Sequence, residues 1–216
     1  MTLTSVDTAT AESRWYPTQP PGPIDTSVAG MVKDSLQRRV RGMHALWLEA
    51  LATMDATHVN YFERPNVLPI AFTVNHQVRL EDATLFLLAE EVPLWFTGGW
   101  AERTQVAIDD IGKETTVAEM EHQRIGDYDA FCDYAHQVYA RTERWLDELP
   151  AEQLYVPMFD GTFPDFIQNA FIHRVVRDEI VLTLDAIECW IYQHGIRHLG
   201  ELEHARALCG LGGLTS

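Results

Sequence analysis

Basic charge, lysine and long apolar runs are all scarce in this 216-residue sequence. It has 16 basic against 32 acidic side chains and a net charge of −16. Such a charge repels a phosphate backbone, which argues against nucleic-acid binding as the main role. Only two of the basic residues, Lys33 and Lys113, are lysine, and this arginine bias is typical of a GC-rich genome. No stretch approaches the roughly 20 uncharged apolar residues of a membrane-spanning helix, so we expect no membrane partner.

Cysteine is scarce as well. Cys132, Cys189 and Cys209 are scattered and form no CxxC pair, which argues against a disulfide scaffold, a zinc ribbon and a redox motif. We expect small, buried thiols in a reducing compartment. The N-terminus, MTLTSVDTATAESRW, has no basic region followed by an apolar core, so we expect no signal peptide. These features predict a cytoplasmic globular protein.

Helical hydrophobic spacing fills most of the sequence. Apolar residues recur three and four positions apart over residues 27–54, 69–90, 127–149 and 162–209. Thr162 is a candidate N-cap for the last segment, which we expect to break near residues 181–185. Strand signals are scarce and no period of 20–50 residues repeats. The sequence therefore predicts an all-α protein.

Two stretches interrupt the helical pattern. Residues 1–26 include WYPTQPPGP, and these clustered prolines predict an extended arm. Residues 91–122 contain Pro93 and a pair of glycines, which predict an irregular connection with short helical pieces. We therefore expect a four-helix bundle domain of residues 27–216, with a long connection between its second and third helices and a Pro-rich N-terminal arm of residues 1–26.

Two histidines stand where the last helix calls for apolar residues. The stripe Ile187, Ile191, His194, His198 and Leu202 places both imidazoles on one face, one turn and ~6 Å apart. An H-x-x-x-H pair of this kind offers two nitrogen ligands to one metal ion. A single core histidine usually contacts a backbone carbonyl, but two stacked imidazoles each need a buried partner. The spacing therefore favours a metal site.

His76 is the best candidate for a third ligand. It lies midway along the most enclosed helix, between Phe72 and Leu80, where a lone imidazole is poorly solvated. Three neutral histidines on two facing helices suit a divalent metal, with zinc first and nickel or iron(II) as alternatives. Such a set leaves coordination positions open, which is typical of a catalytic site.

Two charged residues near these histidines are candidates for catalytic roles. Glu201 follows His198 by three residues and shares its face, so it can orient that imidazole or act as a base. The alternative is a solvated carboxylate. Arg79, near His76, can bind a substrate carboxylate, although a salt bridge to Asp82 or to another helix is the favoured interpretation.

Other notable side chains have structural interpretations. We expect His44 to be a surface or capped histidine, with a position facing the pocket as the alternative, because it borders the apolar stripe of the first helix. Trp95, Phe96 and Trp100 either pack the long connection onto the bundle, which is the favoured interpretation, or form a lid over an opening.

Two segments resemble a known family. PIAFTVNHQVRLEDATLF and, far downstream, HGIRHLGELEHARALCG are similar to the DinB superfamily of metal-binding four-helix bundles. In that family the second helix provides one histidine and the last helix an H-x-x-x-H pair, which match His76, His194 and His198. The resemblance covers most of residues 27–210. The arm and the helical region around residues 166–185 are larger than the minimal family pattern.

The resemblance implies chemistry on low-molecular-weight thiols, as in mycothiol-dependent isomerases of the maleylpyruvate type and mycothiol or bacillithiol transferases. A divalent metal stabilises a thiolate, and a metal-bound thiolate can attack a small electrophilic substrate. The arginine bias favours mycothiol as the co-substrate, and the resemblance also implies a homodimer. Two alternatives remain open: a metal-hydroxide hydrolase at the same site, and a non-enzymatic, stress-associated metal-binding protein.

Overall fold

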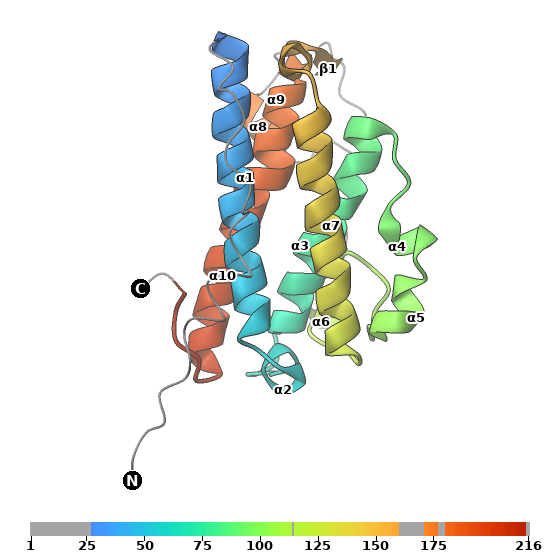
Figure 1. Ribbon diagram of the computed structural model, residues 1–216. Coiled ribbons are helices and arrows are strands. Elements are labelled where there is room, and N and C mark those ends of the chain that lie inside the picture. Colours follow the sequence, from blue (N-terminus) through green and yellow to red (C-terminus); the bar gives the residue numbers. More distant parts are fainter. Residues whose placement is uncertain (1–26, 114, 160–170, 177–179, 215–216) are drawn as a thin grey trace.

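The computed structural model describes residues 27–113, 115–159, 171–176 and 180–214, and over these residues the chain is mostly helical (Figure 1). The dominance of helix confirms the prediction from hydrophobic spacing. The expected arm, residues 1–26, and the expected N-cap Thr162 lie outside the described residues. Among the described helices, none combines the length and the apolar character needed to cross a membrane.

Three of the long helices lie where the sequence predicts them. They are α1 (Val28–Ala52), α3 (Ile70–Ala89) and α7 (Tyr128–Glu148). The Ser27 side chain accepts a hydrogen bond from the backbone of Gly30, and Asp127 accepts one from Ala130. These N-caps satisfy amides that have no partner within the helix. Pro69 immediately precedes α3, where its missing N–H costs nothing.

The fourth long segment has three parts. The helix α9 (Thr183–Ala186) runs into a π-helix, η4 (Ile187–Gln193), and then into α10 (His194–Leu208). The π-helix was not predicted, because its wider turns are not distinguished from α-helix by apolar spacing over seven residues. Its end coincides with the start of the H-x-x-x-H pair.

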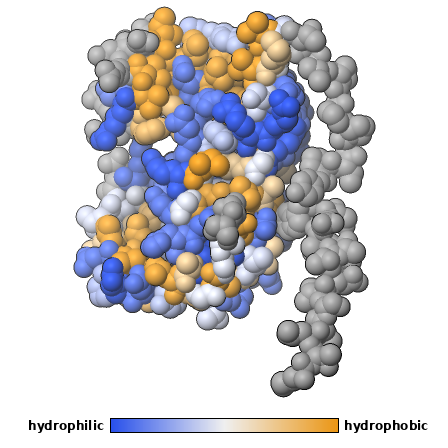
Figure 2. Space-filling view, turned by 90° about the vertical axis from the view of Figure 1, so that its left-hand side faces the viewer, coloured by the Kyte–Doolittle hydropathy of each residue, from blue (hydrophilic) through white to orange (hydrophobic). Residues whose placement is uncertain are grey.

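The long helices lie side by side (Figure 1). Helix α1 packs against α7 and against η4 and α10, while α3 packs against α7 and α10. The core between them contains large, fully buried side chains, including Trp47, Phe131, Tyr134, Tyr139 and Leu146. On the side where α1 and α10 lie, hydrophilic and hydrophobic patches alternate (Figure 2).

Helices α1 and α10 approach closely at Gly195. The Trp47 indole N–H donates to the Gly195 carbonyl oxygen over 3.2 Å. A Cβ atom at Gly195 would lie 2.1 Å from the Met43 sulfur, so any larger residue here would force the Met43 side chain to move. The contact fixes the position of α10 along α1 at the residue that follows His194.

The predicted irregular connection between α3 and α7 is present. Its described residues form three short helices, α4 (Leu94–Thr97), α5 (Trp100–Thr104) and α6 (Val117–Met120), and a further one, α2 (Ala56–Val59), precedes α3. Trp95 and Trp100 are buried and their rings contact Tyr134 of α7. These contacts confirm the packing interpretation for both tryptophans, whereas Phe96 is 71% exposed.

The break expected near residues 181–185 is present, because a short strand lies at residues 181–182. After α7 the chain forms a 3₁₀ helix, η2 (Ala151–Tyr155), and a strand, β1 (Pro157–Phe159). Helix α8 (Phe171–Val176) and strand β2 (Val181–Leu182) precede α9. The strands pair antiparallel, with Pro157 opposite Leu182. Strands of three and two residues are too short to show alternation, which explains why the sequence did not predict this small sheet.

Candidate metal centre

The three predicted ligands come together from two facing helices. His76 lies in the middle of α3, and His194 and His198 lie one turn apart at the start of α10. His194 and His198 are 8% and 7% exposed, and His76 is half-buried. The three side chains form a group that can hold a metal ion, with one ligand atom from each within 4.8 Å of the others.

The spacing of the rings fits a shared cation. The ring centroids are 5.2 Å apart for His76 and His194, 4.9 Å for His76 and His198, and 4.4 Å for His194 and His198. The Nε2 atoms of His76 and His194 lie 3.2 Å apart. Two nitrogens each about 2.0–2.1 Å from one zinc ion are separated by roughly this distance in tetrahedral geometry.

Partners outside the group set which ring nitrogens face its centre. His76 Nδ1 contacts the Ile111 carbonyl oxygen, and His198 Nδ1 lies 2.6 Å from a Glu201 carboxylate oxygen. A carbonyl or carboxylate oxygen accepts only, so each Nδ1 carries the proton and each Nε2 keeps its lone pair. This arrangement orients metal-binding histidines in many proteins.

The nitrogens that face one another also point to a cation. His194 faces His76 through its Nε2, and its buried Nδ1 has no hydrogen-bond partner among the described contacts. At most one proton fits between the Nε2 atoms of His76 and His194. The Arg197 guanidinium lies 3.4 Å from His198 Nε2. A cation between the rings would satisfy these lone pairs together. The donor set therefore fits a divalent metal.

Burial keeps the three imidazoles neutral. Desolvation lowers the pKa of His76, His194 and His198 below the ordinary histidine value, and it lowers that of His194 to about 2 together with repulsion from the other two rings. At His198 the nearby Glu201 carboxylate opposes this shift. Neutral imidazole is the form that coordinates a metal, so these histidines need not lose protons when they bind one at pH 7.

Arg79 lies away from the partners first expected for it. Its guanidinium forms an ion pair with Asp109 at 2.9 Å and lies over the Trp95 ring, 3.9 Å from the centroid. A salt bridge was the favoured interpretation, but its partner is not Asp82. That carboxylate instead accepts hydrogen bonds from the backbone amides of Leu94 and Trp95. The described contacts of Arg79 are with the connection between α3 and α7, and its binding of a substrate stays a prediction.

One buried charged cluster was not predicted. His44 is 1% exposed, and its Nε2 and Nδ1 lie 2.9 Å and 2.8 Å from carboxylate oxygens of Glu81 and Glu143. Although burial opposes the charged form, the two carboxylates prevail and raise the pKa of His44 to about 9. The expectation that His44 is a surface or capped histidine is therefore wrong, because the side chain is buried. Its position beside the apolar stripe of α1 could have indicated this burial.

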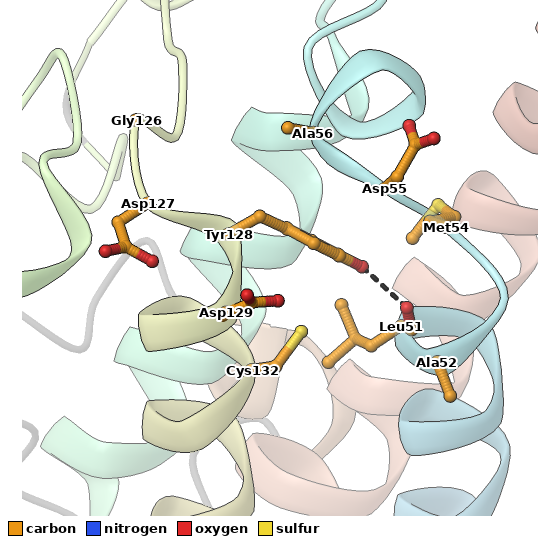
Figure 3. A pocket seen from close by; sticks show the side chains of 10 residues that line it. All are labelled: Leu51, Ala52, Met54, Asp55, Ala56, Gly126, Asp127, Tyr128, Asp129 and Cys132. Carbon is orange, nitrogen blue, oxygen red and sulfur yellow. Dashed lines mark hydrogen bonds between the residues drawn. The ribbon is translucent and has the colours of Figure 1, made fainter.

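A cavity of about 450 Å³ lies elsewhere, between the end of α1 and the start of α7 (Figure 3). Two of its carboxylates, Asp55 and Asp127, serve as N-caps of α2 and α7. The Tyr128 hydroxyl donates to the Leu51 carbonyl oxygen at 2.7 Å. Burial raises the pKa of the Cys132 thiol to about 11, so this cysteine is protonated at neutral pH and is a poor nucleophile.

Comparisons with known proteins show a similar fold but give no information about activity. No family model and no curated protein matches this sequence. Among solved structures, the chain is similar to a conserved protein from Enterococcus faecalis, with 20% identity and a TM-score of 0.63. The match covers 85% of this chain and 98% of that chain, so the likeness extends over most of both folds.

Proposed function

We propose that this protein is a metal-dependent enzyme that joins a low-molecular-weight thiol to a small electrophilic substrate. The observation that carries the proposal is the convergence of three neutral imidazoles from two helices, two of them held by an outer oxygen. A divalent ion bound there would lower the pKa of a thiol and supply a thiolate at neutral pH. Zinc is the favoured metal and mycothiol the favoured thiol, with the reaction being a transfer or an isomerisation.

We propose further that the long segments form a four-helix bundle of the DinB-like kind. The packing of α1, α3, α7 and the segment from α9 to α10 along one another supports this assignment. So does the position of the ligands, with one histidine on the second long segment and two on the last. A cytoplasmic homodimer is part of the same proposal.

The residues around the site have separable tasks in this proposal. His76, His194 and His198 bind the ion. Because the protein provides these three ligands, the remaining coordination positions are free for substrates. Glu201 is 55% exposed at its side chain while it contacts His198 at 2.6 Å. This contact favours a role in orienting the imidazole, and the exposure places the carboxylate where solvent reaches it.

Metal content tests the ligand assignment. The protein is purified, stripped with a chelator and reloaded with zinc, nickel or iron(II), and bound metal is measured by plasma mass spectrometry. We expect one ion per chain in the wild type and a loss of binding in His194→Ala. His122→Ala is the matched control, since that side chain is 71% exposed and is not part of the site. Full occupancy in His194→Ala would overturn the assignment.

The thiol reaction is tested on the loaded protein. Mycothiol, bacillithiol and glutathione are each offered with 1-chloro-2,4-dinitrobenzene, and formation of the thioether is followed by absorbance. We expect turnover that depends on both metal and thiol and is fastest with mycothiol. Turnover of an ester without thiol would favour the hydrolase. Metal binding with no turnover of either substrate class would contradict an enzymatic role.

A further inference from the structure

Residues 108–112, called here the strap, run along α3 beside the three-histidine group and meet the helix at Arg79, His76 and Phe72. We propose that Arg79 and Asp109 hold the strap in place so that its Ile111 carbonyl fixes the orientation and tautomer of His76. Arg79 is then a positioning residue for metal binding, not a group that contacts substrate. The proposal rests on His76 being a metal ligand, as set out above.

The strap reaches the site through a single backbone atom. The Ile111 carbonyl oxygen contacts His76 Nδ1, and because a carbonyl only accepts, the proton of the neutral ring stays on Nδ1. The Nε2 lone pair then faces His194 Nε2, 3.2 Å away. If the strap were displaced, the His76 ring could rotate, or its proton could move to Nε2. A protonated Nε2 has no lone pair with which to bind a metal.

Asp109 anchors the strap to side chains of two different elements. One of its carboxylate oxygens pairs with the Arg79 guanidinium of α3 at 2.9 Å and accepts a hydrogen bond from the Trp95 indole of α4 at 3.0 Å. Arg79 is itself 8% exposed and stacks on Trp95. The anchor lies two residues before Ile111, so it restrains the carbonyl that meets His76.

A second anchor lies at the start of the strap. The fully buried Gln123 side chain accepts a hydrogen bond from the Ile108 amide at 2.9 Å and donates one to the Ile108 carbonyl at 2.7 Å. A paired contact of this kind fixes both the position and the direction of the backbone. The strap is therefore held at residues 108 and 109, immediately before it reaches the site.

The other end of the strap requires a glycine. Gly112 has φ +76°, and a Cβ atom there would lie 2.4 Å from the Phe72 ring. That ring is nearly parallel to the His76 imidazole, with centroids 5.4 Å apart. Phe72 is therefore close to both Gly112 and His76, and the absence of a side chain at Gly112 lets the strap approach the Phe72 ring.

Zinc affinity measured by competition with a chromophoric chelator tests the strap. We expect Gly112→Ala, Asp109→Ala and Arg79→Met each to weaken binding by about 10-fold. Gly210→Ala is the matched glycine control, because Gly210 also has positive φ and has open space around its Cβ position. Arg103→Met is the matched arginine control, since Arg103 stacks on Trp100 just as Arg79 stacks on Trp95. Wild-type affinity in all three strap variants would overturn the proposal.

The tautomer of His76 gives a readout that needs no metal. Long-range ¹⁵N–¹H NMR of the metal-free, folded protein distinguishes protonated from unprotonated ring nitrogens. We expect a proton on Nδ1 of His76 in the wild type and in both controls, and a mixture of tautomers in Gly112→Ala and Asp109→Ala. A wild-type proton on Nε2 would overturn the strap. Failure of the wild type to bind any metal would instead overturn the proposed function, while leaving this test of the strap intact.

Discussion

Glu201 contacts both the three-histidine group and solvent. It lies one turn beyond His198 on α10 and holds the Nδ1 proton of that ring at 2.6 Å. Its side chain is 55% exposed, so removing the charge should not damage packing. Any effect of a substitution there therefore reports on the histidine it contacts.

We predict that Glu201→Gln weakens zinc binding by about 10-fold, because a neutral amide oxygen accepts a weaker hydrogen bond and makes the imidazole less basic. Affinity is measured by chelator competition, and thermal unfolding of the metal-free protein checks that stability is retained. Glu148→Gln, an exposed position on α7, is the control. Unchanged affinity would assign Glu201 to the solvated surface.

The buried His44 makes stability depend on pH on the alkaline side. Its folded-state pKa of about 9 lies above the ordinary value of 6.5 because Glu81 of α3 and Glu143 of α7 face it. The stabilisation is fully present below pH 6.5 and is lost as the pH rises through 9. The three site histidines have lowered pKa values and titrate below this window, so they do not obscure it.

We predict that the free energy of unfolding falls by up to about 1.4 kcal/mol for each pH unit between 6.5 and 9. Urea denaturation of the metal-free protein at several pH values measures this slope. His44→Gln should be less stable at pH 6.5 and should lack the slope, whereas His122→Gln should keep it. A flat profile in the wild type would show that His44 is neutral in the folded protein.

At the scale of the element, α10 offers two glycines in contrasting surroundings. Gly195 faces Met43 of α1, with no room for a Cβ atom, whereas a Cβ at Gly200 meets nothing within 4 Å. Both glycines lie close to ligands, but only Gly195 sets how near α10 comes to α1.

We predict that Gly195→Ala destabilises the protein by about 1–3 kcal/mol through overpacking and weakens zinc binding, since α10 must move with both of its histidines. Gly200→Ala should instead stabilise α10 by up to about 1 kcal/mol, because alanine favours helix. Chemical denaturation and zinc titration of the two variants check this. Equal stability of both would mean that the α1–α10 contact is looser than described.

The elements that could be predicted from sequence are those with local signals. Ser27, Pro69 and Asp127 mark the starts of α1, α3 and α7, and the apolar stripes run between these caps and the helix ends. The three-histidine group followed from residue type and spacing. The small sheet could not be predicted, because its strands pair across a distance in sequence, and η4 could not, because apolar spacing over seven residues does not distinguish a π-helix from an α-helix.

The contacts that the connection between α3 and α7 makes could not be predicted from the sequence either. The pairing of Arg79 with Asp109 joins residues 30 positions apart whose approach depends on how residues 91–127 fold. The same holds for the carbonyl of Ile111, since any backbone carbonyl could serve as a partner for His76. Spacing along one helix predicts ligands on that helix, but it carries no information about contacts made by a loop.

At the scale of the whole molecule, Asp82 joins three parts of the fold. This buried carboxylate of α3 accepts hydrogen bonds from the Leu94 and Trp95 amides of the connection, from the Tyr134 hydroxyl of α7 and from Arg141 of α7. It therefore holds the connection against two long helices, and the strap depends on that placement.

We predict that Asp82→Asn lowers the free energy of unfolding by about 3 kcal/mol. Arg141 loses its buried charge partner, and the NH₂ group of the new side chain faces groups that donate hydrogen bonds to Asp82 in the wild type. Urea denaturation measures the loss, with the exposed Asp133→Asn on α7 as control. Zinc affinity should also fall, because the connection carries the strap. A variant as stable as the control would show that the remaining contacts hold the connection alone.

The separation of the ligands along the chain has a consequence for biosynthesis. His194 follows His76 by 118 residues, so the segment with the first proposed ligand leaves the ribosome well before the segment with the other two. A nascent chain that ends before α10 contains only one of the three proposed ligands. If the three histidines bind an ion as proposed, the ion can be held only after both of these segments have been synthesised.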